Sequence, residues 1–137
     1  MIKVAITSIG SGVGQSVVDS CRNSNLSMKI YGLGMNPLAF GAFDCDERLY
    51  LPTIYDESYV DKLLDYCKEA KFDIVIPGLD DELVLLSQRI EEFNSLGVQI
   101  PVASPDLIQL CRDKGLMSRK LLKYSPSFVQ SFTHEYI

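Results

Sequence analysis

Three closely spaced glycines, Gly10, Gly12 and Gly14, follow the first apolar run of the chain. After them the apolar residues recur with a helical period. A strand that turns through glycines into a helix presents backbone N–H groups, because the first helical turn has unpaired donors and the positive end of the dipole. The sequence therefore predicts an anion-binding loop, made of Gly10, Ser11, Gly12, Val13, Gly14 and Gln15. The alternative is that the glycines only permit a sharp turn and close contact between helix and strand.

The spacing of these glycines departs from the fingerprint of dinucleotide-binding proteins. That fingerprint, G-x-G-x-x-G, would place its third glycine at position 15, where this chain has Gln15, and it expects an acid after the second strand. The second strand expected here, residues 28–34, continues into Met35 and Asn36 without an acid. The loop thus fits a Rossmann-like architecture that lacks the marks of an NAD site.

Three consecutive acids, Asp80, Asp81 and Glu82, follow another apolar run. In one interpretation they only begin a helix, because acids in the first turn interact favourably with the helix dipole. In the other, either Asp80 or Glu82 points into a substrate crevice and binds an amino group, while Asp81 faces solvent. The acids have no His or further acids at ligand spacing, so we expect no metal site. His134 is the only histidine, and no catalytic residue is predicted.

The apolar pattern predicts an α/β, Rossmann-like, doubly wound parallel sheet of about five strands with helices between them. The expected strands are residues 4–9, 28–33, 48–51, 72–77 and 98–102. Because ligands bind at the carboxyl ends of parallel strands, we expect the glycine loop and the turns around Asn36 and Asp80 to meet at one crevice. Thr7 and Ser8 end the first strand, where their hydroxyls could also face this crevice.

Other boundaries follow from local signals. Residues 36–46 are too polar and too rich in glycine for regular structure. Asp56 is expected to cap a helix that carries the stripe Val60 to Cys67, and one helix is expected to contain residues 83–93. Ser104 and Pro105 predict the start of a further helix, followed by a short helix over residues 113–123.

Composition excludes several classes of protein. The 137 residues suit one domain with a sizeable core, and the net charge of −5 argues against nucleic acid as a partner. No apolar run approaches the roughly 20 residues that a membrane span needs, and no secretory signal is recognisable, so we expect a cytoplasmic protein without membrane contact. The four cysteines are widely spaced, which is typical of reduced thiols rather than of a disulfide framework or a zinc site.

The order of these motifs resembles the N-terminal, pre-ATP-grasp domain of ATP-grasp ligases. The residues that carry the resemblance are 6–15, Asn36 with Pro37, 42–50, 73–77 with Asp80 and Glu82, Ser104 with Pro105, and 111–114. They are most similar to carbamoyl-phosphate synthase large-subunit-like proteins and related carboxylate–amine ligases, over roughly residues 2–124. One departure is Gly34, which stands where relatives usually carry an Asp two residues before the Asn-Pro pair.

The resemblance implies a pre-ATP-grasp domain at residues 1–124 and a tail, residues 125–137, that begins an ATP-grasp domain missing from this chain. It implies that Thr7, Ser8, Asn36, Asp80 and Glu82 lie on the side of a small-molecule substrate. Lys114 would lie on the nucleotide side. ATP and magnesium would bind to the longer parent protein, so that the fragment alone would be inactive; a homodimer is also considered. The alternatives are a stand-alone nucleotide- or NAD-binding Rossmann module and a purely supporting domain.

Overall fold

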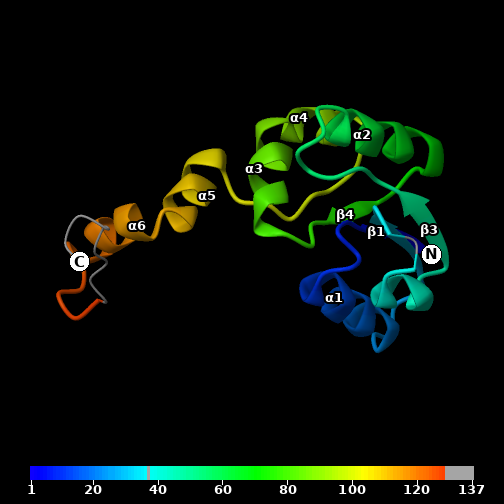
Figure 1. Cartoon of the computed structure of the whole chain (residues 1–137), viewed down its shortest axis with the longest axis horizontal. Coiled ribbons are helices and arrows are strands. Elements are labelled where there is room, and N and C mark those ends of the chain that lie inside the picture. The colour runs from blue at the N-terminus through cyan, green and yellow to red at the C-terminus, as the bar shows by residue number, and fades with distance from the viewer. Residues whose placement is uncertain (37, 129–137) are drawn as a thin grey trace. The chain divides into compact units, whose positions relative to one another are not determined.

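The computed structural model describes residues 1–36 and 38–128, and the chain divides into two compact units, Met1–Val102 and Ala103–Ile137. The first unit holds a sheet of four parallel strands in the order β3-β2-β1-β4. These strands are β1 (Ile2–Ile6), β2 (Met28–Gly34), β3 (Glu47–Tyr50) and β4 (Ile74–Ile76) (Figure 1). The predicted α/β architecture with a parallel, Rossmann-like sheet is therefore confirmed.

The fifth expected strand, residues 98–102, is reduced to a single parallel bridge between Ile74 and Gln99. The N–H of Val75 donates to the carbonyl of Gln99 at 2.9 Å, and the N–H of Gln99 donates to the carbonyl of Asp73 at 3.0 Å. Pro101 follows two residues later and has no N–H to donate, which explains why the ladder does not continue.

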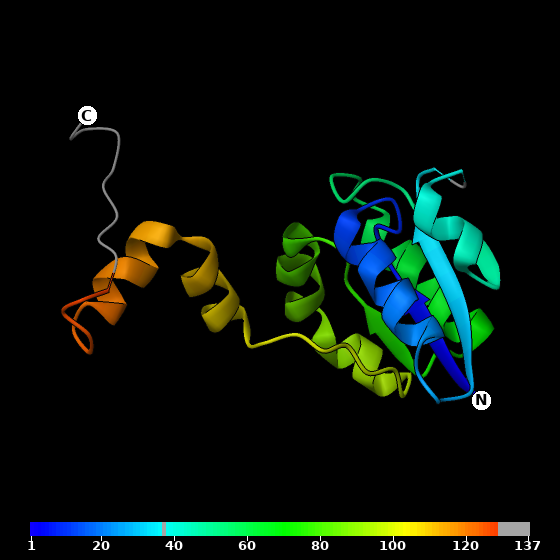
Figure 2. The ribbon, with the colours of Figure 1, turned by 90° about the horizontal axis from the view of Figure 1, so that it is seen from below.

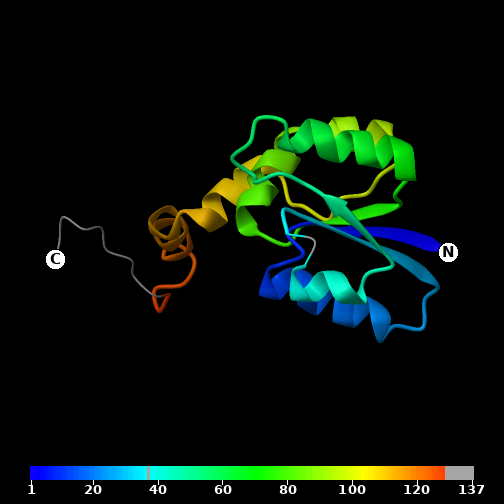
Figure 3. The same cartoon turned by 45° about the vertical axis from the view of Figure 1, so that its right-hand side comes forward.

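Helices cover both faces of the sheet. On one face lie α1 (Gly12–Arg22) and the 3-10 helix η1 (Phe40–Asp44), which contact each other (Figure 2). The buried residues of this layer are Val4, Ile6, Ile9, Val18, Ile30 and Ala42. On the other face lie α2 (Tyr59–Ala70), α3 (Asp80–Gln88) and α4 (Ile90–Ser95) (Figure 3). The buried core of that layer is larger; it includes Tyr31, Leu33, Tyr59, Leu63, Val75, Leu86 and Phe93.

Three local predictions were wrong. The connection expected to be irregular contains η1. Helix α2 begins at Tyr59 after Ser58, and Asp56 does not cap it, because its Oδ1 accepts the N–H and hydroxyl of Ser58 at 2.8 and 2.7 Å and so forms a turn before the helix. The single helix expected over residues 83–93 is interrupted at Arg89, whose backbone leaves the helical region at φ −116° and ψ 20°.

The second unit contains α5 (Pro105–Arg112) and α6 (Lys114–Leu121), so both expected helix starts are confirmed. The Asp113 carboxylate caps α6 by accepting the N–H of Leu116 at 2.8 Å. His134 and most of the expected tail lie outside the described residues. No helix in the described part of the chain is long and apolar enough to cross a bilayer.

Candidate functional site

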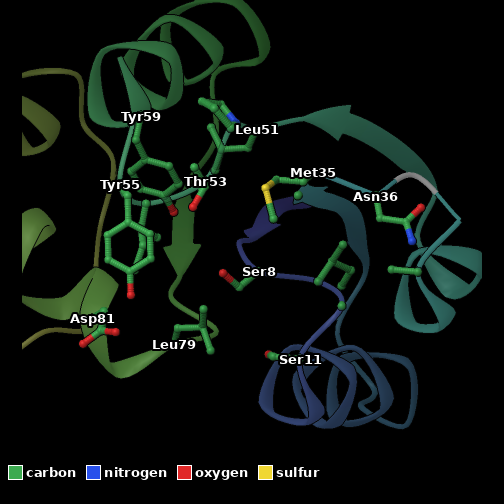
Figure 4. A pocket seen from close by; sticks show the side chains of 16 residues that line it. Ser8, Ser11, Met35, Asn36, Leu51, Thr53, Tyr55, Tyr59, Leu79 and Asp81 are labelled. Atoms are coloured by element: carbon green, nitrogen blue, oxygen red, sulfur yellow. The ribbon is translucent and has the colours of Figure 1, made fainter. Parts of the chain in front are cut away.

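A pocket of about 310 Å³ lies at the carboxyl ends of the strands, within the first unit. The loops after all four strands contribute to it (Figure 4): Ser8, Ile9, Gly10 and Ser11 after β1; Gly34, Met35, Asn36 and Ala39 after β2; Leu51, Pro52, Thr53, Ile54, Tyr55 and Tyr59 after β3; Leu79 and Asp81 after β4. The three turns that were expected to meet thus line one pocket. The sequence analysis missed the fourth, residues 51–55.

The glycine loop reaches this pocket only with its first half. Gly10 and Ser11 line the pocket, whereas residues 12–15 do not. Ser11 caps α1: its hydroxyl accepts the N–H of Gly14 at 2.9 Å, and its carbonyl accepts that of Gln15 at 3.0 Å. Within the described residues, this leaves the amides of Gly12 and Val13 in the first turn without an acceptor. Anion binding by the loop stays a prediction, and these two amides lie outside the pocket.

Two glycines bring this site together by close approach. A Cβ on Gly78, just after β4, would lie 2.3 Å from the Thr7 carbonyl oxygen, and one on Gly14 would lie 2.8 Å from that of Ser8. Both distances are shorter than any side chain tolerates, so these positions need glycine. The hydroxyl of Ser11 also donates to the Gly78 carbonyl at 3.0 Å, which joins the loop after β1 to the loop after β4. Gly14 therefore has the structural role given above as the alternative: it permits close contact between the helix and the strand end.

Glu82 lies in the core rather than in the crevice, with a fully buried side chain. Its carboxylate accepts five hydrogen bonds: from the hydroxyls of Thr7 (2.8 Å), Ser8 (2.7 Å) and Tyr59 (2.5 Å), and from the N–H groups of Gly78 (2.8 Å) and Leu79 (3.0 Å). Every partner is a donor, an arrangement that suits an ionised carboxylate. Burial and this neighbouring negative charge raise the pKa of the Tyr59 phenol.

This network has two consequences for the predicted substrate side. Thr7 is fully buried and, like Glu82, does not line the pocket. Ser8 does line it, and its backbone has the left-handed φ of 46°, a conformation that costs energy for a residue with a Cβ. The Ser8 hydroxyl donates to Glu82, so the carboxylate contacts a residue of the pocket lining without lining the pocket itself.

Asp81, not Asp80, faces the pocket. Asp81 is partly buried and lines it, whereas Asp80 is exposed and does not. The expectation that Asp81 faces solvent was therefore wrong. The physical reason is that α3 begins at Asp80, and successive helical side chains point about 100° apart. Three adjacent acids consequently face solvent, pocket and core in turn.

The remaining predicted residues divide between the two units. Asn36 lines the pocket, and its Oδ1 accepts the N–H of Leu38 at 2.9 Å. Lys114 is exposed at the start of α6, in the second unit, and is not among the residues that line the pocket. No group of three or more potential metal ligands occurs among the residues that the structure describes.

Sequence reasoning missed the aromatic side of the pocket. Figure 4 shows Tyr55 and Tyr59 on one side, with Met35 and Asn36 on the other. Tyr55 is 84 % exposed, whereas the body of Tyr59 is buried in the core. The available signal was that the short strand before Pro52 must also end at this edge of the sheet, so that the loop after it belongs with the other three.

The fold and pocket define an open, parallel α/β domain with a small-molecule-sized site at its strand ends. Residues 4–101 match the family described as PylC-like, N-terminal domain, and the chain belongs to this family. No curated protein sequence matches the chain.

Solved structures share the fold. Pyruvate carboxylase T882A from Rhizobium etli has a TM-score of 0.61 at 18% identity, over 88% of this chain and 13% of that one. N5-carboxyaminoimidazole synthetase from Staphylococcus aureus, complexed with ADP, has a TM-score of 0.59 at 18% identity, over 90% and 30%. The biotin carboxylase domain of a single-chain bacterial carboxylase has a TM-score of 0.63 at 20% identity, over 99% and 33%. The chain thus spans 13% to 33% of the length of these proteins.

Proposed function

We propose that this chain is the N-terminal, substrate-side domain of an ATP-grasp ligase that joins a carboxylate to an amine. The observation that carries the proposal is the pocket. Four strand-end loops form it, and all of its lining residues lie within the matched residues 4–101. In an open parallel sheet this edge is where ligands bind. A pocket of about 310 Å³ is at the lower end of the range for small-molecule sites.

The comparisons support the same class of enzyme. A carboxylase and a synthetase share the fold, and the chain corresponds to a minor part of each. This agrees with a longer parent protein in which the remaining domains complete the site. A carbamoyl-phosphate-synthase-like reaction belongs to the same class of ligases, but the family match favours the PylC-like branch. We also propose a small-molecule substrate and a cytoplasmic location.

The pocket does not fit the triphosphate of ATP. Phosphoryl transfer is catalysed by cations around the transferring group, usually magnesium with Lys or Arg. The described residues that line the pocket include no Lys or Arg that could place a positive charge beside phosphate. We therefore propose that ATP and magnesium bind to other parts of the longer protein, with Lys114 toward the nucleotide side, and that the isolated chain has no ligase activity.

The proposal is tested by following ADP release from MgATP by the purified chain, together with calorimetric titration of MgATP. No turnover and no saturable binding are expected, in the presence or absence of amino and carboxylate substrates. Turnover or micromolar binding that disappears in Lys114→Ala would contradict the proposal. That result would favour the alternative of a nucleotide-binding module complete within these residues.

A further inference from the structure

The pocket has a buried apolar floor and an exposed apolar rim. The floor consists of Ile9 and Leu51, which are buried in the two core layers and still line the pocket. The rim consists of Met35, Tyr55 and Leu79, which are exposed and come from the loops after β2, β3 and β4 (Figure 4). Single exposed apolar residues are ordinary on a protein surface, whereas several gathered around one opening are typical of a binding site.

The hydroxyl groups of the pocket wall have no hydrogen left for a ligand. The hydroxyls of Ser8 and Tyr59 both donate to Glu82, at 2.7 and 2.5 Å. The hydroxyl of Ser11 donates to the Gly78 carbonyl at 3.0 Å. Each hydroxyl has one hydrogen, so none of the three can donate to a ligand without giving up a hydrogen bond inside the chain.

Charged side chains add little to recognition of a polar ligand. The described lining residues include no Lys or Arg, and Asp81, their one acid, already has an interaction within the chain. A strongly hydrated group would therefore lose water in the pocket without gaining equal partners, which costs free energy. A hydrocarbon group has no hydrogen bonds to lose, and the removal of its surface from water favours binding. The wall thus favours an apolar group over a polar group of the same size.

We propose that the pocket binds an uncharged apolar side chain of the substrate, aliphatic or aromatic, between the floor and the rim. The inference rests on the proposed function and deepens it: this domain selects its substrate by a hydrocarbon group, whatever charge the reacting end of the molecule carries. The volume of about 310 Å³ is at the lower end for small-molecule sites, which suits a group of the size of a leucine or phenylalanine side chain.

The amino acids L-leucine and L-asparagine test this selectivity, because they share the charged head group and have side chains of similar size and branching. Each is titrated into the ¹⁵N-labelled chain at pH 7 and fixed salt, and dissociation constants are taken from the amide shifts of Gly10, Met35 and Leu79. Leucine should bind at least about tenfold more tightly than asparagine, since several buried carbon atoms each contribute. L-Alanine, which lacks the branched body, should bind about as weakly as asparagine.

The variants Met35→Ser and Leu26→Ser form a matched pair. Both natural side chains are 60 % exposed, but only that of Met35 lines the pocket. Met35→Ser should weaken the binding of leucine about threefold or more and leave that of asparagine unchanged, whereas Leu26→Ser should change neither.

Two results would count against this inference in different ways. Binding of asparagine as tightly as leucine, or an equal loss in both variants, would overturn the apolar selectivity but leave a substrate site in place. If none of the three amino acids gave saturable shifts at Gly10, Met35 and Leu79, both this inference and the proposed function would be overturned.

Discussion

The hydroxyl of Tyr59 donates a hydrogen bond of 2.5 Å to Oε1 of Glu82, and it does so with both side chains buried. This bond joins the start of α2 to the start of α3, two helices that are 23 positions apart in the chain at these residues. The same carboxylate also holds the end of β1 through Thr7 and Ser8. One side chain therefore fixes three of the loops whose ends form the pocket.

Replacing Glu82 should destabilise the chain strongly. Glu82→Gln replaces one acceptor oxygen by an amide N–H₂ where five groups donate, so that any hydroxyl that turns to accept from it must point its own buried hydrogen elsewhere, and we expect a loss of about 3 kcal/mol in the free energy of unfolding. Tyr59→Phe removes one bond and should cost about 1.5 kcal/mol. Urea denaturation measures both. Asp80→Asn on the same turn is the control and should change stability by less than about 0.5 kcal/mol; an equally small loss in Glu82→Gln would contradict the account.

Two glycines near the pocket should respond oppositely to alanine. In Gly78→Ala the new Cβ meets the Thr7 carbonyl oxygen at 2.3 Å, so the backbone must shift and we expect a loss of about 2 kcal/mol. At Gly12 nothing lies within 4 Å of the added Cβ, and alanine favours the helix, so the change should lie between zero and a gain of about 1 kcal/mol. Thermal and urea unfolding compare the two variants. Equal effects at both positions would show that the close approach at Gly78 carries no strain.

The four thiols should react in a definite order. Burial raises the pKa of Cys45 to about 11 and that of Cys67 to about 12, so both are protonated at pH 8, and Cys67 is also shielded from solvent. Cys111 is exposed. Because the thiolate is the reactive form, iodoacetamide at pH 8 should label Cys111 first and Cys67 last, as read by mass spectrometry of peptides. Fast labelling of Cys67 in the folded chain would contradict the described core.

Acid should weaken one specific contact. The N–H of Ile30 donates to Asp46 at 2.7 Å, and this bond, with Arg22 nearby, lowers the pKa of the Asp46 carboxyl. A lowered folded pKa adds stability above the unfolded value of about 4, which is lost as the pH falls through the folded pKa. Asp46→Asn should therefore be less stable than the natural chain at pH 7, by under about 1 kcal/mol because the pair is largely exposed, and the difference should vanish near pH 2. A constant difference would exclude this linkage.

The sheet was predictable because its signals are local. Strand and helix periodicity around Val4, Ile30 and Val75 places each element without knowledge of its neighbours. The missing fifth strand depends on a smaller effect, since Pro101 removes a single donor and leaves one bridge at Gln99.

The candidate site was predictable only in part. Its position follows from topology, which brings the ends of parallel strands to one edge. The roles of Asp80, Asp81 and Glu82 do not, because a one-residue shift in where α3 begins rotates each acid by about 100°. The five donors that converge on Glu82 come from residues up to 75 positions away, and no local sequence pattern predicts these contacts. The sequence pattern did not assign Tyr55 to the site, although its loop belongs to the same edge.

The central claim is that the strand-end pocket is a small-molecule substrate site and not a nucleotide site. The most direct measurement is a map of backbone amide shifts in the ¹⁵N-labelled chain during parallel titrations with a panel of small amino and carboxylate compounds and with MgATP. The account predicts saturable shifts for at least one compound of the panel at Gly10, Ser11, Tyr55 and Asp81, all of which line the pocket, and none there for MgATP. Saturable MgATP shifts at these four residues, with none for any compound of the panel, would contradict it.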